Sequence, residues 1–188
     1  MSKELPYQRE SLIVGVDQFS DWRPLDDSIM GGKSNSICQV RKEGLFVEGN
    51  LVEEGGGFIS CRSSVMSHPL DLSSFSAFQL NVDGDGRTLK FAVACKDKIL
   101  GLVDLMDWGL RWVAEFPTNE SGTTQVIIPF TTLKPTVRAK SVTLPIKFDS
   151  SVITQFQLLH SKFGQPGELN KGFRPGPIKI LLRSIHAI

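Results

Sequence analysis

The sequence has few of the residues that usually mark a catalytic centre. Its 188 residues include only three histidines and three cysteines, which lie far apart, and it has no Cys-x-x-Cys pair. Because a bound metal ion needs several such side chains close together, this spacing gives no metal or cofactor site. No nucleophile with a base partner is visible either, so we expect a protein without enzyme activity, metal ion or cofactor.

The sequence also lacks an excess of charge of one sign and any long hydrophobic run. The formal net charge is +1, and no basic stripe alternates with aromatic residues, which disfavours RNA or DNA as a partner. No apolar run approaches the roughly 20 residues of a membrane span. The first sixteen residues have the pattern of neither a secretory signal nor a transit peptide. We therefore expect a cytoplasmic protein that touches a membrane at most peripherally.

The three cysteines are Cys38, Cys61 and Cys95. Their number is odd, their spacings are long and their neighbours are apolar. We interpret them as reduced core residues rather than as disulfide partners or nucleophiles.

Alternation of apolar and polar residues recurs along the chain. In "FQLNV", Phe78, Leu80 and Val82 share one face, which is the period of a half-buried strand. The other expected strands are 36–40, 45–51, 89–95, 110–116, 124–130, 154–160 and 178–188. "RKEG" and "DGDGR" each separate two such segments and predict hairpin turns. The pattern predicts an all-β protein, an antiparallel two-sheet β-sandwich.

The sandwich is expected to form one domain over residues 19–188. Residues 1–18 would be an N-terminal extension or edge element, and Gln8 to Phe19 favours either a short helix or an edge strand. The segment Lys162 to Pro177 contains four glycines and three prolines, which predicts a long, exposed loop.

Two glycine-rich blocks resemble each other: "DDSIMGGKSNS" from Asp26 and "EEGGGFISCR" from Glu53. We interpret them as neighbouring parts of one structural corner, in which Asp27 bonds to backbone amides and the double glycine lets the chain turn sharply. Met30 and Phe58 would be buried there. A pairing of Asp26 or Asp27 with Arg62 is a further expectation.

Other readings of these blocks and of the "VDGDGR" turn fit less well. "GGKS" lacks the first glycine of a phosphate loop, because Asp27 stands at that position. The paired acids could serve glycoside hydrolysis only if they faced each other across a cleft. Asp83 and Asp85 do not match a calcium-hand loop, since Arg87 stands at its third ligand position, but another kind of calcium site remains open.

Taken together, "WRPLDDSIMGGKS" and "FVEGNLVEEGGGFISCR" closely resemble the complex I intermediate-associated protein 30 family. Segments 71–91 and 126–140 are similar in the same order, so the resemblance covers residues 19–188. The resemblance implies a galactose-binding-like, jelly-roll sandwich. The motif residues carried over are Trp22, Asp27, Met30, Gly31, Gly32, Ser34, Gly56, Gly57, Phe58, Arg62, Gly84, Asp85, Gly86, Arg87, Pro129, Phe130, Pro135 and Arg138.

The resemblance implies a non-enzymatic assembly factor, or chaperone, that binds protein subunits during biogenesis of a membrane-bound electron-transport complex. That complex would be a complex I-like NADH dehydrogenase or, as for some relatives linked to photosynthesis, a photosystem. Without a transit peptide, a stand-alone bacterial or cyanobacterial member is expected. The alternative is a carbohydrate- or small-ligand-binding module, for which Trp108 and Trp112 would have to form an exposed platform.

The partner surface is expected on exposed loops, because arginine and aromatic side chains often anchor interfaces. The candidates share exposure on loops and one of these two residue types: Arg87, Arg138, Phe163, Phe173 and Arg174.

Overall fold

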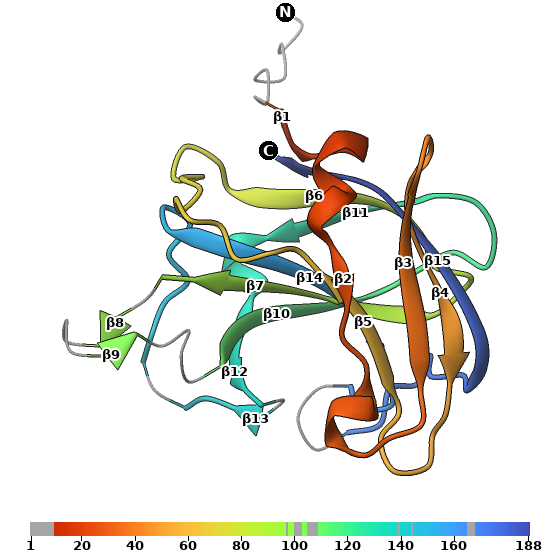
Figure 1. Ribbon diagram of the computed structural model, residues 1–188. Coiled ribbons are helices and arrows are strands. Elements are labelled where there is room, and N and C mark those ends of the chain that lie inside the picture. Colours follow the sequence, from red (N-terminus) through yellow and green to blue (C-terminus); the bar gives the residue numbers. More distant parts are fainter. Residues whose placement is uncertain are drawn as a thin grey trace, which may run out of the picture.

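The computed structural model describes residues 10–96, 98–99, 103–104, 109–138, 140–143, 145–164 and 168–188, and its regular elements are almost all strands (Figure 1). The strands are β1 (Ser11–Val14), β2 (Arg23–Pro24), β3 (Asn35–Arg41), β4 (Gly44–Leu51), β5 (Phe58–Arg62), β6 (Ala77–Asp83), β7 (Thr88–Cys95), β8 (Lys98–Ile99), β9 (Val103–Asp104), β10 (Leu110–Pro117), β11 (Thr124–Pro129), β12 (Lys134–Val137), β13 (Lys140–Ser141), β14 (Ile153–Ser161) and β15 (Gly176–Ala187). Three short 3-10 helices are η1 (Val16–Asp21), η2 (Asp27–Met30) and η3 (Phe130–Thr132).

The strands form two antiparallel sheets that face each other, as the sequence predicted. The six-stranded sheet has the order β11-β6-β15-β4-β3, with β1 also paired to β15. The seven-stranded sheet has the order β13-β12-β10-β7-β14-β5-β2. Strands β8 and β9 form a separate two-stranded sheet. The segment from Gln8 to Phe19 holds both expected elements in its described part, since β1 is a strand and η1 a short helix.

Of the two hairpins predicted, one is confirmed and one is wrong. Strands β3 and β4 form the first, with Arg41 paired to Gly44 at its turn. The "DGDGR" segment instead carries the chain from β6 in the six-stranded sheet to β7 in the seven-stranded sheet. Alternation shows only that the apolar faces of β6 and β7 point into a core. It does not distinguish strands of one sheet from strands that face each other across the sandwich.

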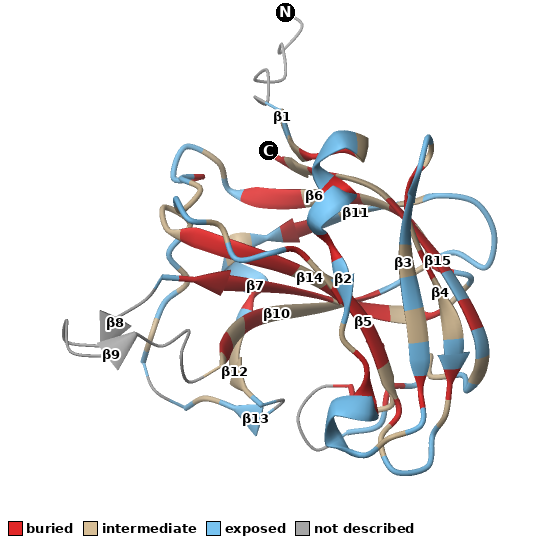
Figure 2. Cartoon of the chain, in the orientation of Figure 1, coloured by how far each residue is buried: buried red, intermediate tan, exposed pale blue. Residues whose placement is uncertain are grey.

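The core lies between the sheets and is rich in phenylalanine. Figure 2 shows buried residues along β6, β7 and β14. Phe78 of β6 meets Phe91 of β7 edge to face at 5.2 Å between ring centroids, and Phe91 stacks on Phe156 of β14 at 5.7 Å. All three side chains are fully buried, so these rings join the two sheets and contribute about 2 to 3 kcal/mol each through burial. None of the helices in the described ranges is long and apolar enough to cross a membrane.

Candidate functional site

The two glycine-rich blocks meet around the buried carboxylate of Asp27, so the predicted corner is confirmed. This carboxylate accepts hydrogen bonds from the backbone amides of Ser34 (2.9 Å), Gly57 (2.6 Å) and Phe58 (3.2 Å). The Ser34 hydroxyl donates a further hydrogen bond of 2.7 Å. One acidic side chain therefore ties η2, the start of β3 and the start of β5 together.

Glycines leave the space that this carboxylate occupies. A Cβ atom at Gly32 or Gly56 would lie 2.3 or 2.5 Å from side-chain atoms of Asp27, which no side chain tolerates. Gly31 ends η2 in the left-handed conformation, with φ at 87°, where other residues are strained. The glycine repeats are thus explained by close approach and backbone conformation, without a ligand.

The charge of Asp27 is stabilised by these hydrogen bonds, and no cationic side chain of the described residues pairs with it. Burial by itself would raise the pKa of Asp27, but the hydrogen bonds from Ser34, Gly57 and Phe58 outweigh it and lower the pKa below its usual value. The side chain is therefore ionised at neutral pH.

The expected pairing of Asp26 or Asp27 with Arg62 is wrong. The carboxylate of Asp26 accepts hydrogen bonds from the Ser36 hydroxyl (2.8 Å) and the Ser60 amide (3.3 Å). Arg62 lies on β5, and within the described ranges it makes no ion pair with either aspartate. The two aspartates are therefore bonded to serine hydroxyls and backbone amides, and not to the arginine that the sequence predicted.

The expected burial of Met30 is also wrong. Met30 is 68% exposed and its neighbour Ile29 is 64% exposed, because η2 turns Asp27 inward and projects the next side chains outward. Phe58 is half-buried rather than fully buried. Trp22, by contrast, is buried and meets Phe19 edge to face at 5.5 Å, so this motif residue belongs to the core.

Cys38 and Cys61 form a disulfide, which corrects the interpretation of all cysteines as reduced. Cys38 lies on β3 and Cys61 on β5, and their Cα atoms are 6.5 Å apart although 23 positions separate them in the chain. The disulfide joins the two sheets beside the Asp27 corner. Cys95 is buried and not part of a disulfide, as expected.

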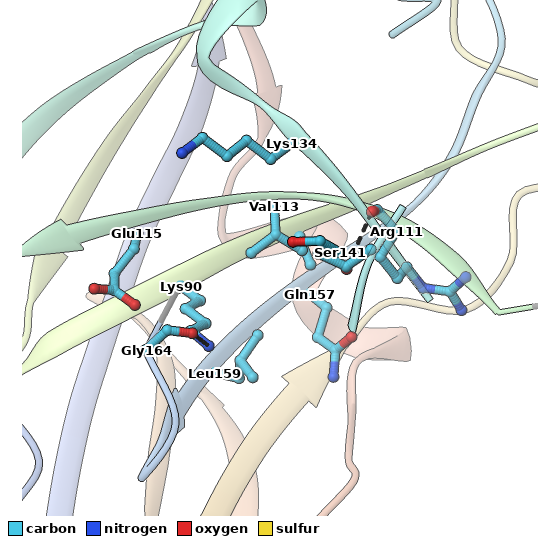
Figure 3. Close-up of a pocket in the computed structure, with 11 residues that line it drawn as sticks. Lys90, Arg111, Val113, Glu115, Lys134, Ser141, Gln157, Leu159 and Gly164 are labelled. Carbon is cyan, nitrogen blue, oxygen red and sulfur yellow. Dashed lines mark hydrogen bonds between the residues drawn. The ribbon is translucent and has the colours of Figure 1, made fainter. Parts of the chain in front are cut away.

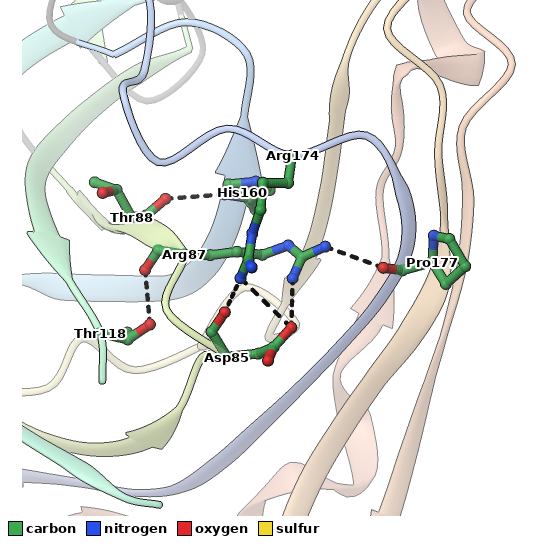
Figure 4. A network of polar contacts seen from close by, with 7 residues as sticks. All are labelled: Asp85, Arg87, Thr88, Thr118, His160, Arg174 and Pro177. Atoms are coloured by element: carbon green, nitrogen blue, oxygen red, sulfur yellow. Dashed lines mark hydrogen bonds and ion pairs between the residues drawn. The ribbon is translucent and has the colours of Figure 1, made fainter. Parts of the chain in front are cut away.

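The "DGDGR" turn is held by arginines (Figure 4). Arg87 is 3% exposed, so its expected exposure on a loop is wrong. Its guanidinium donates to the Asp85 carboxylate (2.7 Å) and to the Pro177 carbonyl (3.0 Å). Arg174 also donates to the Asp85 backbone oxygen. Burial lowers the pKa of Arg87 and repulsion by Arg174 lowers it further, while Asp85 partly offsets both effects.

This arrangement disfavours the calcium site that the sequence left open. Asp83 pairs with Arg183, with a nitrogen to oxygen distance of 2.7 Å, and Asp85 pairs with Arg87. Each carboxylate thus already has a guanidinium partner, which a calcium ion would have to displace. No group of three or more His, Cys, Asp or Glu side chains is placed to hold a metal ion within the described residues.

His160 is buried beside this network and is held neutral. Its Nδ1 donates to the Thr88 carbonyl at 2.9 Å, and its ring stacks on Phe173 at 5.6 Å. Burial lowers the pKa of His160 to about 4; the hydrogen bond to Thr88 opposes this shift and nearby cationic side chains add to it. Figure 4 shows His160 with Thr88 next to the Arg87 side chain.

Stability should therefore fall as the pH drops from about 6.5 to about 4. Below pH 6.5 the unfolded chain takes up a proton at this histidine while the folded protein does not, and below pH 4 both forms are protonated. The loss of unfolding free energy is roughly 3 kcal/mol across this window. Chemical denaturation at several pH values measures it. His160→Gln should flatten the decline and the exposed-site variant His68→Gln should not; identical declines in both would contradict the assignment.

The remaining partner candidates lie on two loops. Arg138 is exposed and adopts a positive φ of 49° after β12. Phe163 is 54% exposed, and Arg174 is exposed as predicted. Phe173 is half-buried against His160, so its expected exposure is only partial.

The loop from Lys162 to Pro177 is less exposed than predicted. Residues 165–167 lie outside the described part. Asn170 is buried, and its amide donates to the carbonyls of Thr88 (3.1 Å) and Ser161 (2.9 Å). The second half of the loop is therefore packed on the sandwich.

A hollow of about 170 Å³ lies on the outer face of the seven-stranded sheet, and sequence reasoning missed it (Figure 3). Strand register explains it. Ala92 of β7 lies between its two cross-strand neighbours, Val113 of β10 and Gln157 of β14. Lys90 likewise lies between Glu115 and Leu159. Small Ala92 among longer neighbours leaves the surface concave.

One end of the hollow is closed by the loop after β14. The Lys90 ammonium donates to the carbonyls of Phe163 and Gly164, at 2.5 and 2.8 Å. Burial lowers the pKa of Lys90, and the charge of Glu115 partly opposes this. The Glu115 Oε2 atom is shielded from solvent and has no hydrogen-bond partner among the described residues. In Figure 3, Glu115, Lys90 and Gly164 lie at this end, and Arg111 lies at the other.

The other end is positively charged. Arg111 donates to the side-chain oxygen Oε1 of Gln155 at 3.2 Å. Burial lowers the pKa of Arg111, and repulsion by Arg62 lowers it further. No carboxylate within the described ranges forms an ion pair with Arg62 or Arg111. Within the described residues, the hollow therefore combines an apolar floor with two arginines that form no ion pair.

The aromatic platform proposed for sugar binding is not formed by Trp112. This residue is 2% exposed and points into the core, where it meets Phe148 at 5.7 Å. Trp108 lies outside the described residues.

Comparison with known sequences identifies the family. The model of the complex I intermediate-associated protein 30 family matches residues 12–182, and the chain belongs to this family. A relative in Schizosaccharomyces pombe, named "Uncharacterized protein C9E9.15", is 27% identical over 184 residues, which cover 89% of this chain and 78% of that protein.

Solved structures agree with the fold. The family 11 carbohydrate-binding module of the cellulosomal cellulase Lic26A-Cel5E of Clostridium thermocellum superposes with a TM-score of 0.62 at 15% identity, covering 96% of this chain and 95% of that one. The same type of module in complex with a β-1,3-1,4-mixed-linked tetrasaccharide gives a TM-score of 0.61 at 16% identity, with 95% of both chains covered. At this identity the similarity establishes the β-sandwich fold alone.

Proposed function

We propose that the protein is a non-enzymatic assembly factor that binds a partner polypeptide while a membrane-bound electron-transport complex is being built. Membership of the complex I intermediate-associated family over residues 12–182 is the observation that carries this proposal. The complex would be an NADH dehydrogenase of the complex I type or a photosystem. The protein would act from the cytoplasm, with at most peripheral contact with the membrane.

The structure supports a binding role through two features. The Asp27 corner and the Arg87 network fix loops at one end of the sandwich through contacts within the chain, without using a ligand. The hollow on the seven-stranded sheet offers a concave surface with charged and apolar side chains, as binding sites for polypeptides and small molecules do.

The test is to follow an affinity-tagged copy through native separation of solubilised membrane complexes in a strain that lacks the untagged protein. We expect the tagged protein to migrate with partly assembled subcomplexes and to be absent from the finished complex. Loss of the protein should lower the amount of finished complex. Normal assembly without the protein, or its presence as a permanent subunit of the finished complex, would contradict the proposal.

A carbohydrate-binding role is the second candidate, because the fold matches a module that was solved with a mixed-linked tetrasaccharide. The burial of Trp112 argues against it. We expect calorimetric titration with that tetrasaccharide to show no binding at millimolar concentration. Binding that disappears when Ala92→Leu fills the hollow, in a variant that melts normally, would instead favour the carbohydrate role.

A further inference from the structure

Among the described residues, the outer face of the seven-stranded sheet carries more positive than negative charge around its hollow. Glu115 lies directly across from Lys90 in the strand register, so these two charges offset each other. Arg62 and Arg111 lie on or next to the other end of the hollow, and neither forms an ion pair within the described ranges. The surplus contrasts with the chain as a whole, whose formal net charge is only +1.

We propose that this hollow is the docking surface for an extended, acidic segment of the partner polypeptide, with a carboxylate held between Arg62 and Arg111. The inference rests on the proposed function and adds to it the place and the chemistry of the contact. A carboxylate at this position would remove the repulsion between the two guanidiniums and accept charge-assisted hydrogen bonds from both.

The shape of the hollow favours a polypeptide over other anions. Ala92, Val113 and Leu159 form an apolar floor that can take one side chain of a bound strand. Alternate side chains of an extended segment point the same way about 7 Å apart, so one can fill the floor while another reaches the arginines. A nucleic acid would need a continuous basic track for its phosphates, and Glu115 interrupts the positive surface.

Site-specific photo-cross-linking in native membranes tests the proposal. A benzoylphenylalanine replaces Ser141, which is exposed on β13 at the rim of the hollow, or Gln39, which is exposed on β3 of the other sheet. We expect position 141 to capture a subunit of the assembling complex through a segment rich in Asp and Glu, and position 39 to capture much less. The captured segment is identified by mass spectrometry.

Variants that remove the charge of the two arginines test whether cross-linking depends on that charge. Arg62→Gln with Arg111→Gln should reduce cross-linking from position 141 roughly tenfold or more, because the carboxylate loses both of its charge-assisted hydrogen bonds. Arg41→Gln, which removes an exposed positive charge on β3, should leave it unchanged. Thermal melting confirms that each variant is folded. If the double variant unfolds, a synthetic peptide of the captured segment is titrated onto the wild-type protein instead. Replacing the Asp and Glu residues of the peptide by Asn and Gln should abolish its binding.

Several outcomes would overturn the inference while leaving the proposed function intact. One such outcome is that subcomplexes co-purify with the protein while position 141 captures a neutral or basic segment, a nucleic acid or nothing. Equal affinity of the acidic peptide and of its variant with Asn and Gln would also overturn the inference. Failure of the protein to co-purify with any subcomplex contradicts the proposed function instead, and is separate from these results.

Discussion

Replacing Asp27 with alanine is expected to lower the free energy of unfolding by about 3 to 5 kcal/mol. The substitution leaves the buried amides of Ser34, Gly57 and Phe58 without an acceptor, and each unsatisfied group costs about 1 to 3 kcal/mol. Because hydrogen bonding lowers the pKa of Asp27 in the folded protein, its stabilising effect is present above about pH 4. The effect is lost as the pH falls through the folded pKa.

Urea denaturation of a small variant series measures this effect. Asp27→Asn keeps the shape but places an amide donor against amide donors, so it should also be destabilising, by about 2 kcal/mol or more. Asp17→Asn, at an exposed acidic residue of η1, should change stability by less than about 0.5 kcal/mol. If Asp27→Asn were as stable as the wild type, the corner would not depend on the charged carboxylate.

Removing the Cys38–Cys61 disulfide is expected to lower the unfolding free energy by about 3 kcal/mol. The bond closes a loop across a sequence separation of 23 and so restricts the unfolded chain. For a domain of this size the melting temperature should fall by roughly 6 to 12 °C. Calorimetry of Cys38→Ser beside the wild type measures the difference.

A reductant supplies the control for this prediction. Reduced wild type and Cys38→Ser should melt at the same temperature, and reductant should have no effect on Cys38→Ser. Three free thiols in the denatured, unreduced wild type, together with no response to reductant, would show that the disulfide does not form in solution.

The strands could be predicted from the sequence because their apolar residues alternate, as in "LKFAVAC" of β7. The pairing of the strands could not be predicted in the same way. The turn around Asp85 has the composition of a hairpin but connects the two sheets, and the difference arises from contacts far along the chain, such as Arg87 with Pro177. Local patterns carry no information on such contacts.

The same limit explains the errors in the site. The spacing of Cys38 and Cys61 did not indicate a disulfide, because only the fold brings β3 and β5 together. The corner buries the charged side chain of Asp27 and leaves the apolar side chain of Met30 exposed. This is unusual, since charged side chains rarely occupy interiors without partners. The signal for it was the abundance of glycine and serine, whose amides and hydroxyls supply those partners.

The outward-facing residues of β7 and β10 carry a sequence signal for the hollow. In β7 the residues on the outer face are Lys90, Ala92 and Ala94, so the middle strand of the sheet offers two small side chains next to a long one. In β10 the matching residues are Arg111, Val113 and Glu115. Small residues flanked by long charged residues on the outer face of a central strand predict a depression with a polar rim.

The most direct test of this account is a cryo-electron microscopy structure of an assembly intermediate purified through the tagged protein. The account predicts that a segment of a partner subunit lies over the outer face of the seven-stranded sheet, with its carboxylate between Arg62 and Arg111. A partner that contacts only the six-stranded sheet, with the hollow open to solvent, would contradict it.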